Sequence, residues 1–394
     1  MIPVRWWPLL GLLVLMLGSV GCKKSVTAGP AKLADRVTAY KAFPRQRAYW
    51  PTQGWQQKKP AEVGMDSAAL KKAMAYAFSR TGDEKNRKGI RTDGVVIIHK
   101  GYLVHEQYAR GYKAETSHLS WSVSKSFVNA LFGIAEHKGL LKRSDLASKY
   151  VKGMDKGEAS KVTIQNLLNM ASGLCWSEGY ESSPLKSTVI KMLYTAGRED
   201  MAKFAVEQGM CFHAGTHWYY SSGTSNLLMG ILRNVVTPAK YVSFVWKELI
   251  ERIGMKDVTW ERDGSGNFVG SSYLHAPPRE LAKFGFLFLN DGVWEDKRLL
   301  PKDWVAFSTT TPRADTKGIA GAHWWLNVGR PKQKVPRRFP DAPADTFMAS
   351  GHWGQYIIVI PSRDLVIVRV GDDRDKSFRR NTLIKLVLAS LKTK

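Results

Sequence analysis

Cysteine is scarce in this chain, with three residues among 394, and nothing in their arrangement points to a metal site. Cys22 stands near the N-terminus, which leaves Cys175 and Cys211. These two could pair in an oxidising compartment or remain two unpaired core residues, and both alternatives stay open. Their spacing does not match a zinc site, and the nearby His213 and His217 lack the His-Glu-x-x-His pattern. We therefore expect no metal.

Acidic residues are also few, since 34 Asp and Glu stand against 59 Lys and Arg for a formal net charge of +25. A positive net charge of this size suits a protein surface that faces an anionic polymer such as cell-wall groups, and nucleic acid is a second candidate partner. The basic residues are spread along the chain, without an aromatic-interleaved stripe or a zinc finger. The Gly-rich stretch at 264–270 follows no clear strand, so it is a weak phosphate-binding signal. We expect no nucleic-acid partner.

Long hydrophobic runs, internal repeats and heptad patterns are absent after residue 22. The apolar run at 6–17 follows Arg5 and precedes small residues, which is typical of a secretory signal over residues 1–22. The small residues before Cys22 resemble a bacterial lipoprotein cleavage box, although Ser19 stands where leucine is usual. A plain signal or an uncleaved anchor is the alternative. We expect an exported, periplasmic or cell-envelope protein that meets a membrane only through a lipid on Cys22.

The two ends of the folded region carry matching patterns of strands and helices. Residues 23–60 are polar and interrupted by prolines, which indicates a tether and an extended arm. The elements expected after it are a helix at 67–78 capped by Asp66, strands at 94–99 and 102–108 joined at Lys100-Gly101, strands at 355–360 and 364–370, and a helix at 378–391.

The middle of the chain shows mostly helical patterns broken by loops, at 163–170, 189–194, 241–253 and 279–289. Strand pairs at both ends with helices between them predict one antiparallel sheet beside a helical insertion. We therefore divide the chain into an α/β sheet domain of residues 61–115 with 290–394 and a helical domain of residues 116–289.

Ser122 and Lys125 lie three residues apart at the start of a predicted buried helix that runs to Gly139. Residues at i and i+3 share a helix face, so Lys125 can serve as the base for Ser122. The helix N-terminus favours a developing alkoxide and disfavours a protonated lysine. The spacing alone is a weak signal, because it recurs at Ser183 and Lys186 in a loop and is otherwise typical of a solvated helix cap.

Two further motifs follow in the order that one hydrolase family shows. Tyr220 begins a Tyr-Ser-Ser stretch before a helical run, and residues 349–356 read Ala-Ser-Gly-His-Trp-Gly-Gln-Tyr before a strand. With Ser122-x-x-Lys125 they resemble the three motifs of the penicillin-recognising serine hydrolases. The match is closer to the class C β-lactamase-related branch, near the 6-aminohexanoate-dimer hydrolases and esterase-like members, and extends from about residue 55 to the C-terminal helix.

This resemblance implies a β-lactamase/transpeptidase-like α+β fold, with an antiparallel sheet from both chain ends flanked by helices and a mostly helical inserted domain. It also implies an acyl-enzyme on Ser122, formed from a small amide or ester, with Lys125 and Tyr220 as acid and base and with no cofactor. The backbone N–H groups of Ser122 and Gln355 would hold the oxyanion. Tyr220 could instead be a core aromatic with a satisfied hydroxyl.

The departures from the family pattern concern the substrate. Ser222 stands where the second motif often has Asn, and His352 stands where β-lactamases and many peptidases carry Lys. A mostly neutral histidine weakens the fixed cation for a penicillin carboxylate, which favours amide and ester hydrolases. Gly354, Glu178 and Tyr180 join His352 as candidate substrate-binding residues. His352 could instead only shape the pocket, and Glu178 and Tyr180 could lie in a solvated loop.

Alternative functions on the same scaffold are a β-lactamase, a DD-peptidase-like penicillin-binding protein, and a sensor that is acylated without turnover. The adjacent Trp324 and Trp325 are expected in the core or in the pocket wall. The oligomeric state stays open.

Overall fold

A computed structural model describes residues 34–39, 46–80, 82, 84–180 and 186–392. The predicted signal over residues 1–22 and the predicted lipidation of Cys22 lie outside the described residues. Within these ranges, no helix combines the length and the apolar character needed to cross a membrane.

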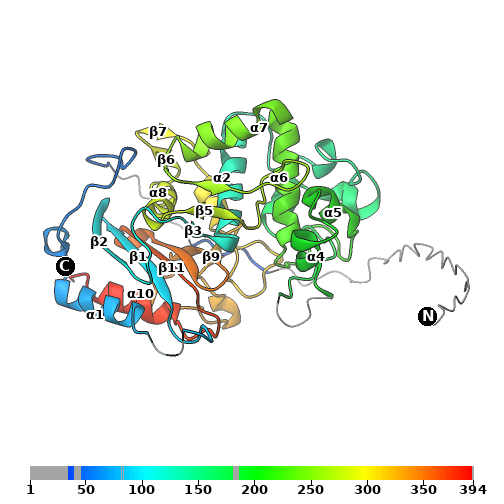
Figure 1. Cartoon of the computed structure of the whole chain (residues 1–394). Coiled ribbons are helices and arrows are strands. Elements are labelled where there is room, and N and C mark those ends of the chain that lie inside the picture. Colours follow the sequence, from blue (N-terminus) through cyan, green and yellow to red (C-terminus); the bar gives the residue numbers. More distant parts are fainter. Residues whose placement is uncertain (1–33, 40–45, 81, 83, 181–185, 393–394) are drawn as a thin grey trace, which may run out of the picture.

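The central element is a six-stranded antiparallel sheet assembled from the two ends of the folded chain (Figure 1). This confirms the predicted fold class. The strands follow the order β2-β1-β11-β10-β9-β8. Their bounds are Thr92–His99 for β1, Tyr102–Tyr108 for β2, Trp325–Leu326 for β8, Phe347–Gly351 for β9, Gln355–Ile360 for β10 and Leu365–Gly371 for β11. The short strands β8 and β9 were not predicted.

Lys100 and Gly101 make the two-residue turn between β1 and β2, as predicted. Their φ angles of +51° and +87° place both in the left-handed region. A turn with two positive φ angles matches the right-handed twist of the strands that it joins, which explains the glycine here.

Helices cover both faces of the sheet, so the inner strands read as continuous apolar runs rather than alternating ones. On one face, alternate residues such as Val95 and Ile367 pack with α1 (Ser67–Ala77) and α10 (Arg380–Ala389), which lie side by side in Figure 1. Asp66 caps α1 as predicted, because its Oδ1 accepts a hydrogen bond of 2.7 Å from the N–H of Ala69.

The other face of the sheet packs against α8 (Pro278–Leu289) and the larger core cluster. A Cβ at Gly285 of α8 would lie 2.7 Å from Cγ2 of Ile357, so this glycine lets the helix approach the strands closely. The predicted helical domain of residues 116–289 included α8. Its packing on β1, β10 and β11 associates α8 with the sheet, while the division into two domains stays a prediction.

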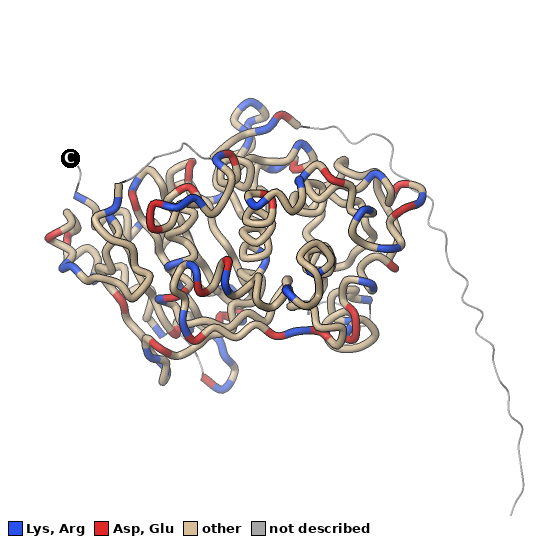
Figure 2. Tube along the Cα trace, turned by 90° about the horizontal axis from the view of Figure 1, so that it is seen from above, with Lys and Arg blue, Asp and Glu red and all other residues tan. Residues whose placement is uncertain are grey.

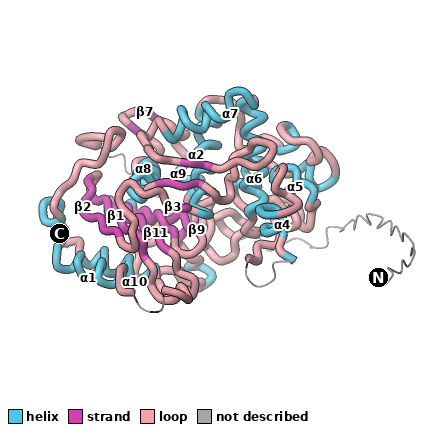
Figure 3. Tube along the Cα trace, in the orientation of Figure 1, coloured by secondary structure: helices cyan, strands magenta, loops and turns pink. Residues whose placement is uncertain are grey.

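The remaining helices gather beside the sheet (Figure 3). Their bounds are Ser124–His137 for α2, Ile164–Leu168 for α3, Thr188–Tyr194 for α4, Met201–Glu207 for α5, Ser222–Val236 for α6, Pro238–Val245 for α7 and Trp304–Ser308 for α9. The predicted helix at 241–253 begins earlier, since Pro238 fits the first turn of α7, and it continues as a π-helical turn over Trp246–Ile250.

Two small sheets complete the described structure. β3 (His118–Leu119), β5 (Leu274–Ala276) and β4 (Thr259–Trp260) form one, and β6 (Val293–Trp294) with β7 (Lys297–Arg298) forms the other. β3 leads directly into the segment that carries Ser122. Lys and Arg are scattered among Asp and Glu along the described part of the trace (Figure 2), as the sequence indicated.

Candidate active site

Ser122 lies in a 3₁₀ turn, Trp121–Val123, that leads directly into α2. We expected Ser122 in the first turn of the α-helix, whereas the structure places it in the 3₁₀ turn directly before that helix. The turn packs against β9, where a Cβ at Gly351 would lie 2.2 Å from the carbonyl oxygen of Ser120. A glycine at position 351 therefore allows the end of β9 to approach the segment that carries Ser122 closely.

Lys125 is 2% exposed, and its Nζ forms three hydrogen bonds. The distances are 2.9 Å to Ser122 Oγ, 3.1 Å to Ser222 Oγ and 2.8 Å to the carbonyl oxygen of Ser271. No ion pair with a carboxylate occurs in the part of the chain that the structure describes. Burial lowers the pKa of Lys125 to about 8, and the charge of Glu178 opposes this shift. A buried amine of this kind can lose its proton near neutral pH.

Tyr220 lies against the other two predicted catalytic residues. Lys125 Nζ is 4.9 Å from the centre of the Tyr220 ring, and the ring also stacks on Trp325 with centroids 5.4 Å apart. Burial and then the charge of Glu178 raise the pKa of Tyr220, while a hydrogen bond with Ser122 lowers it. The phenol is therefore protonated at neutral pH. The structure brings Ser122, Lys125 and Tyr220 together.

Glu178 faces the protein at this site. Its carboxylate accepts hydrogen bonds from the Ser222 hydroxyl, from the Ser222 N–H at 3.0 Å and from Trp176 Nε1. Ser222 is the first residue of α6, so the carboxylate also lies at the positive end of that helix. These contacts link the loop of residues 174–180 to Ser222, which contacts Lys125.

Tyr180 and His352 form an aromatic cluster next to the Ser122 turn. Their rings stack with centroids 5.3 Å apart, and His352 also contacts Trp121 at 5.6 Å and Trp353 at 4.5 Å. Burial, followed by the charge of Glu178, raises the pKa of Tyr180. Two of the four predicted substrate-binding residues, Tyr180 and His352, thus lie in a largely aromatic cluster.

Gly354 and Gln355 turn out to have internal partners. Gly354 has φ +102°, and its carbonyl oxygen accepts a hydrogen bond of 2.9 Å from Arg369, a buried residue paired with Asp373. The Gln355 side chain bonds the N–H of Gly371 at 3.0 Å and its carbonyl at 2.6 Å. Gln355 begins β10, an inner strand between β9 and β11. The predicted contacts of both residues with substrate or oxyanion stay predictions.

The cavity at Ser122 includes a histidine that the sequence analysis did not single out. His323 lines it together with Ser122, Lys125 and Tyr220. Ser350 of the third motif and Trp325, which was expected in the core or the pocket wall, line it too. His323 Nε2 lies 2.8 Å from Ser225 Oγ and its Nδ1 lies 2.7 Å from the Leu168 carbonyl. Burial above all, with the Lys125 charge as a smaller cause, lowers the pKa of His323 to about 3. No sequence motif marks this histidine, because its position depends on contacts with Ser225 and Leu168, which are far from it in the sequence.

Both tryptophans of the adjacent pair line the cavity at Ser122. Trp324 is 2% exposed, stacks on Phe284 and contacts Phe288 in the core, while Trp325 stacks on Tyr220. The sequence left the two locations open for both residues, and the structure uses both.

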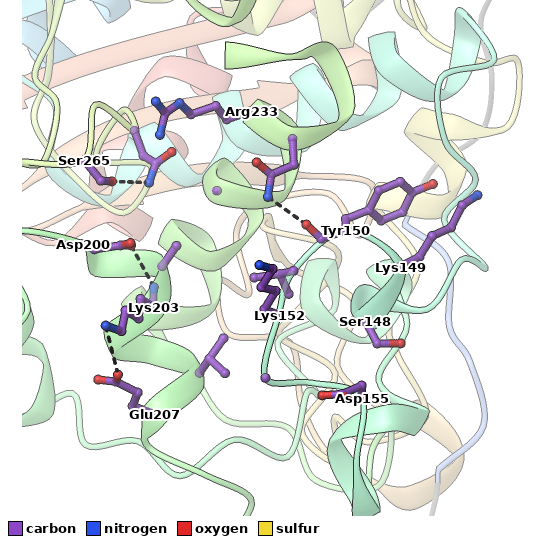
Figure 4. A pocket seen from close by; sticks show the side chains of 17 residues that line it. Ser148, Lys149, Tyr150, Lys152, Asp155, Asp200, Lys203, Glu207, Arg233 and Ser265 are labelled. Carbon is purple, nitrogen blue, oxygen red and sulfur yellow. Dashed lines mark hydrogen bonds and ion pairs between the residues drawn. The ribbon is translucent and has the colours of Figure 1, made fainter.

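A larger hollow of about 1040 Å³ lies elsewhere, between α5, α6 and the segment at 148–155 (Figure 4). It shares no lining residue with the cavity at Ser122. Lys203 lies 3.8 Å from Glu207, and Asn234 donates a hydrogen bond of 2.8 Å to the Tyr150 carbonyl. The second Ser-x-x-Lys match cannot be compared, because Ser183 lies outside the described residues.

Cys175 and Cys211 form a disulfide, with Cα atoms 4.9 Å apart. The bond ties the loop that carries Glu178 to the segment before α6. The described ranges contain no group of three or more His, Cys, Asp or Glu residues placed to hold a metal ion. His213 instead lies 2.9 Å from Glu158.

The sequence and the fold are similar to those of known proteins. The family model described as beta-lactamase matches residues 67–389. The 6-aminohexanoate-dimer hydrolase of Paenarthrobacter ureafaciens is 22% identical over 274 residues, which cover 67% of this chain and 68% of that protein.

Two solved structures show the same fold. A proposed 6-aminohexanoate-dimer hydrolase from Bacillus anthracis has a TM-score of 0.62 at 20% identity and covers 91% of this chain and 89% of its own. EstCE1, a hydrolase with promiscuous acyltransferase activity, has a TM-score of 0.62 at 13% identity, covering 83% of this chain and 99% of its own. Since the family model covers most of the chain, this protein belongs to the beta-lactamase family of serine hydrolases.

Proposed function

We propose that this protein hydrolyses a small amide or ester through an acyl-enzyme on Ser122. The observation that carries the proposal is the contact of 2.9 Å between Ser122 Oγ and a buried lysine amine that has no carboxylate ion pair in the described ranges. Such an amine can accept the serine proton as the hydroxyl attacks a carbonyl carbon. Names of relatives, which include a 6-aminohexanoate-dimer hydrolase, support the reaction class.

In the proposed reaction Lys125 takes the proton of Ser122, and the attack produces a tetrahedral oxyanion. The Ser122 N–H is one proposed donor to this oxyanion, and the N–H of Gln355, the first residue of β10, is the other. Tyr220, protonated because burial raises its pKa, gives a proton to the leaving group. Collapse yields the acyl-enzyme, which water then hydrolyses with the same residues in reverse roles.

The surroundings of Ser122 support an uncharged substrate group over a penicillin carboxylate. His352 occupies the position of the fixed cation and is stacked on Tyr180. Trp121, Trp325 and Tyr180 make the nearby walls aromatic, which suits an apolar acyl or leaving group. A β-lactam would lose the charge pairing that such a cation provides.

The test is intact-protein mass spectrometry after brief exposure to a short-chain p-nitrophenyl ester, a 6-aminohexanoate dimer or a penicillin. We expect a transient adduct from the ester or the amide, with product release, and no adduct on the Ser122→Ala variant. A long-lived adduct from penicillin alone would replace the proposal with a penicillin-binding or sensor role. Full turnover by Ser122→Ala would overturn the assignment of the nucleophile.

We also propose that the protein is exported. A disulfide between Cys175 and Cys211 is typical of oxidising compartments, which agrees with the signal pattern of residues 1–22. Cell fractionation with mass analysis of the mature N-terminus tests this. A cytoplasmic protein with an intact residue 1 would refute it.

A further inference from the structure

The amine of Lys125 has three hydrogen-bonding neighbours in the described structure, and they differ in whether each can donate a proton to it. The Ser271 carbonyl oxygen, 2.8 Å away, has no proton to give. Ser222 Oγ, 3.1 Å away, donates its single proton to Glu178 and can only accept from Lys125. Ser122 Oγ, 2.9 Å away, also has a hydrogen bond with Tyr220, and because the protonated phenol can donate that bond, the Ser122 proton remains available to Lys125.

This count decides where the lysine lone pair points. A neutral amine has two N–H donors and one lone pair. Ser271 and Ser222 each take one N–H, so the lone pair is left facing the hydroxyl of Ser122. That is the orientation in which Lys125 can accept the serine proton. If the Ser222 hydroxyl were reversed, it would donate to the lone pair and occupy it.

Glu178 prevents that reversal. Each of its three contacts is a donor, namely the Ser222 hydroxyl, the Ser222 N–H and the indole N–H of Trp176, so the carboxylate acts as an acceptor alone. Two of these donors belong to Ser222, and the N–H belongs to the first residue of α6. The bond from the Ser222 N–H thus fixes the carboxylate next to the hydroxyl that it orients.

We propose that Glu178 is a positioning residue, which acts through Ser222 to aim the lone pair of Lys125 at Ser122. The inference rests on the function proposed above and adds a residue that does not touch the reacting atoms. Its logic parallels the aspartate of a Ser-His-Asp triad, which holds the histidine in the productive tautomer. Here the group that is held is a serine hydroxyl.

Glu178 also has a separate electrostatic effect on Lys125. Among the described residues, the ionisable groups that face Lys125 are Glu178 from the 174–180 loop, Tyr220 before α6 and His323 before β8. Burial keeps Tyr220 and His323 uncharged at neutral pH, so Glu178 supplies the charge that favours the protonated lysine. Loss of this charge lowers the pKa of Lys125. The neutral base then persists to lower pH.

The test is the pH dependence of kcat/KM for a p-nitrophenyl ester with Glu178→Gln. Glutamine keeps the shape, yet its amide can donate to Ser222 and release the hydroxyl to turn toward Lys125. We expect the plateau of kcat/KM to fall by about tenfold or more, and the acid limb to move to lower pH. A plateau equal to that of the parent protein would overturn the positioning role, and an acid limb that stays in place would refute the separate electrostatic effect.

Ser222→Ala provides the second variant, because it removes the hydroxyl through which Glu178 acts. We expect its plateau to fall, and we expect Glu178→Gln to lower the plateau no further in the Ser222→Ala background. Additive losses in the double variant would refute action through Ser222. Glu207→Gln on the exposed side of α5 is the charge-matched control, and we expect it to leave both the plateau and the limb unchanged.

Ser122→Ala in the same series separates the two proposals. If Ser122→Ala retains turnover, the proposed nucleophile is wrong and the positioning role falls with it. If Ser122→Ala is inactive while the pH profile of kcat/KM for Glu178→Gln has the same plateau and the same acid limb as that of the parent protein, only the positioning role is refuted. Fluorophosphonate titration of Ser122 corrects the rates for any unfolded fraction in the variants that keep this serine, and circular dichroism checks the fold of Ser122→Ala.

Discussion

The indole of Trp176 lies directly against Gly223, the second residue of α6. A Cβ at Gly223 would come within 2.4 Å of Cζ3 of Trp176. Because Trp176 donates to Glu178, this contact sets how closely the 174–180 loop approaches the start of α6. The loop and the helix therefore meet through a glycine that leaves space for an aromatic ring.

Gly223→Ala tests the importance of this contact for activity. The added methyl group would displace Trp176 and with it Glu178, so we expect a stability loss of about 1–3 kcal/mol and a lower kcat. Denaturant unfolding and ester hydrolysis measure the two effects. Gly230→Ala is the matched control on the same helix, because its Cβ would meet Ala202 at 2.6 Å. The control should lose stability with kcat retained, and equal kcat losses in both variants would contradict this explanation.

The pH profile of the parent protein reports the buried base. Since burial lowers the pKa of Lys125 to about 8 and the neutral amine is the active form, kcat/KM should rise with pH and level off above about pH 8. Lys125→Arg should lose nearly all activity at every pH up to 10, because a guanidinium stays protonated. A profile that is flat from pH 6 to pH 9 in the parent protein would exclude Lys125 as the titrating base.

Removal of the disulfide should destabilise the protein. The bond closes a loop with a sequence separation of 36, so the double substitution Cys175→Ser with Cys211→Ser should cost about 4 kcal/mol through unfolded-state entropy. Equilibrium unfolding with and without reductant measures the loss. The parent protein should approach the variant when reduced, and the variant should not respond to reductant. A reductant effect of equal size on both would assign it to another cause.

Gly354 should be intolerant of a side chain for reasons of stability. Its φ is +102°, and a Cβ would lie 2.4 Å from the Asp373 carboxylate within the buried ion pair with Arg369. Gly354→Ala should therefore cost at least about 2 kcal/mol. Gly111→Ala is the control, because φ is +82° and nothing lies within 4 Å of its Cβ. It should cost about 1 kcal/mol of backbone strain alone. Equal losses would show that the ion pair adjusts freely.

Local patterns predicted the regular elements well where a single segment carries the whole signal. The helix capped by Asp66, the turn at Lys100-Gly101 and the strand Gln355–Ile360 all occur as expected. Short strands such as β8 and β9 were missed, since two to five residues hold too little pattern to separate a strand from a loop. Their pairing with β10 and with each other depends on the assembled sheet.

The sequence alone determined the family, the antiparallel sheet from both chain ends, and the three residues Ser122, Lys125 and Tyr220 that the site brings together. These features can be read from short motifs and from the patterns of single segments of the chain. Tertiary structure alone decided that Glu178 turns inward to Ser222, that Gly354 contacts Arg369, and that Ser271 offers its carbonyl to Lys125. Each of these contacts joins residues far apart in the chain, and the last uses a backbone atom that every residue type possesses. A sequence pattern of side chains therefore cannot predict the contact between Lys125 and the Ser271 carbonyl.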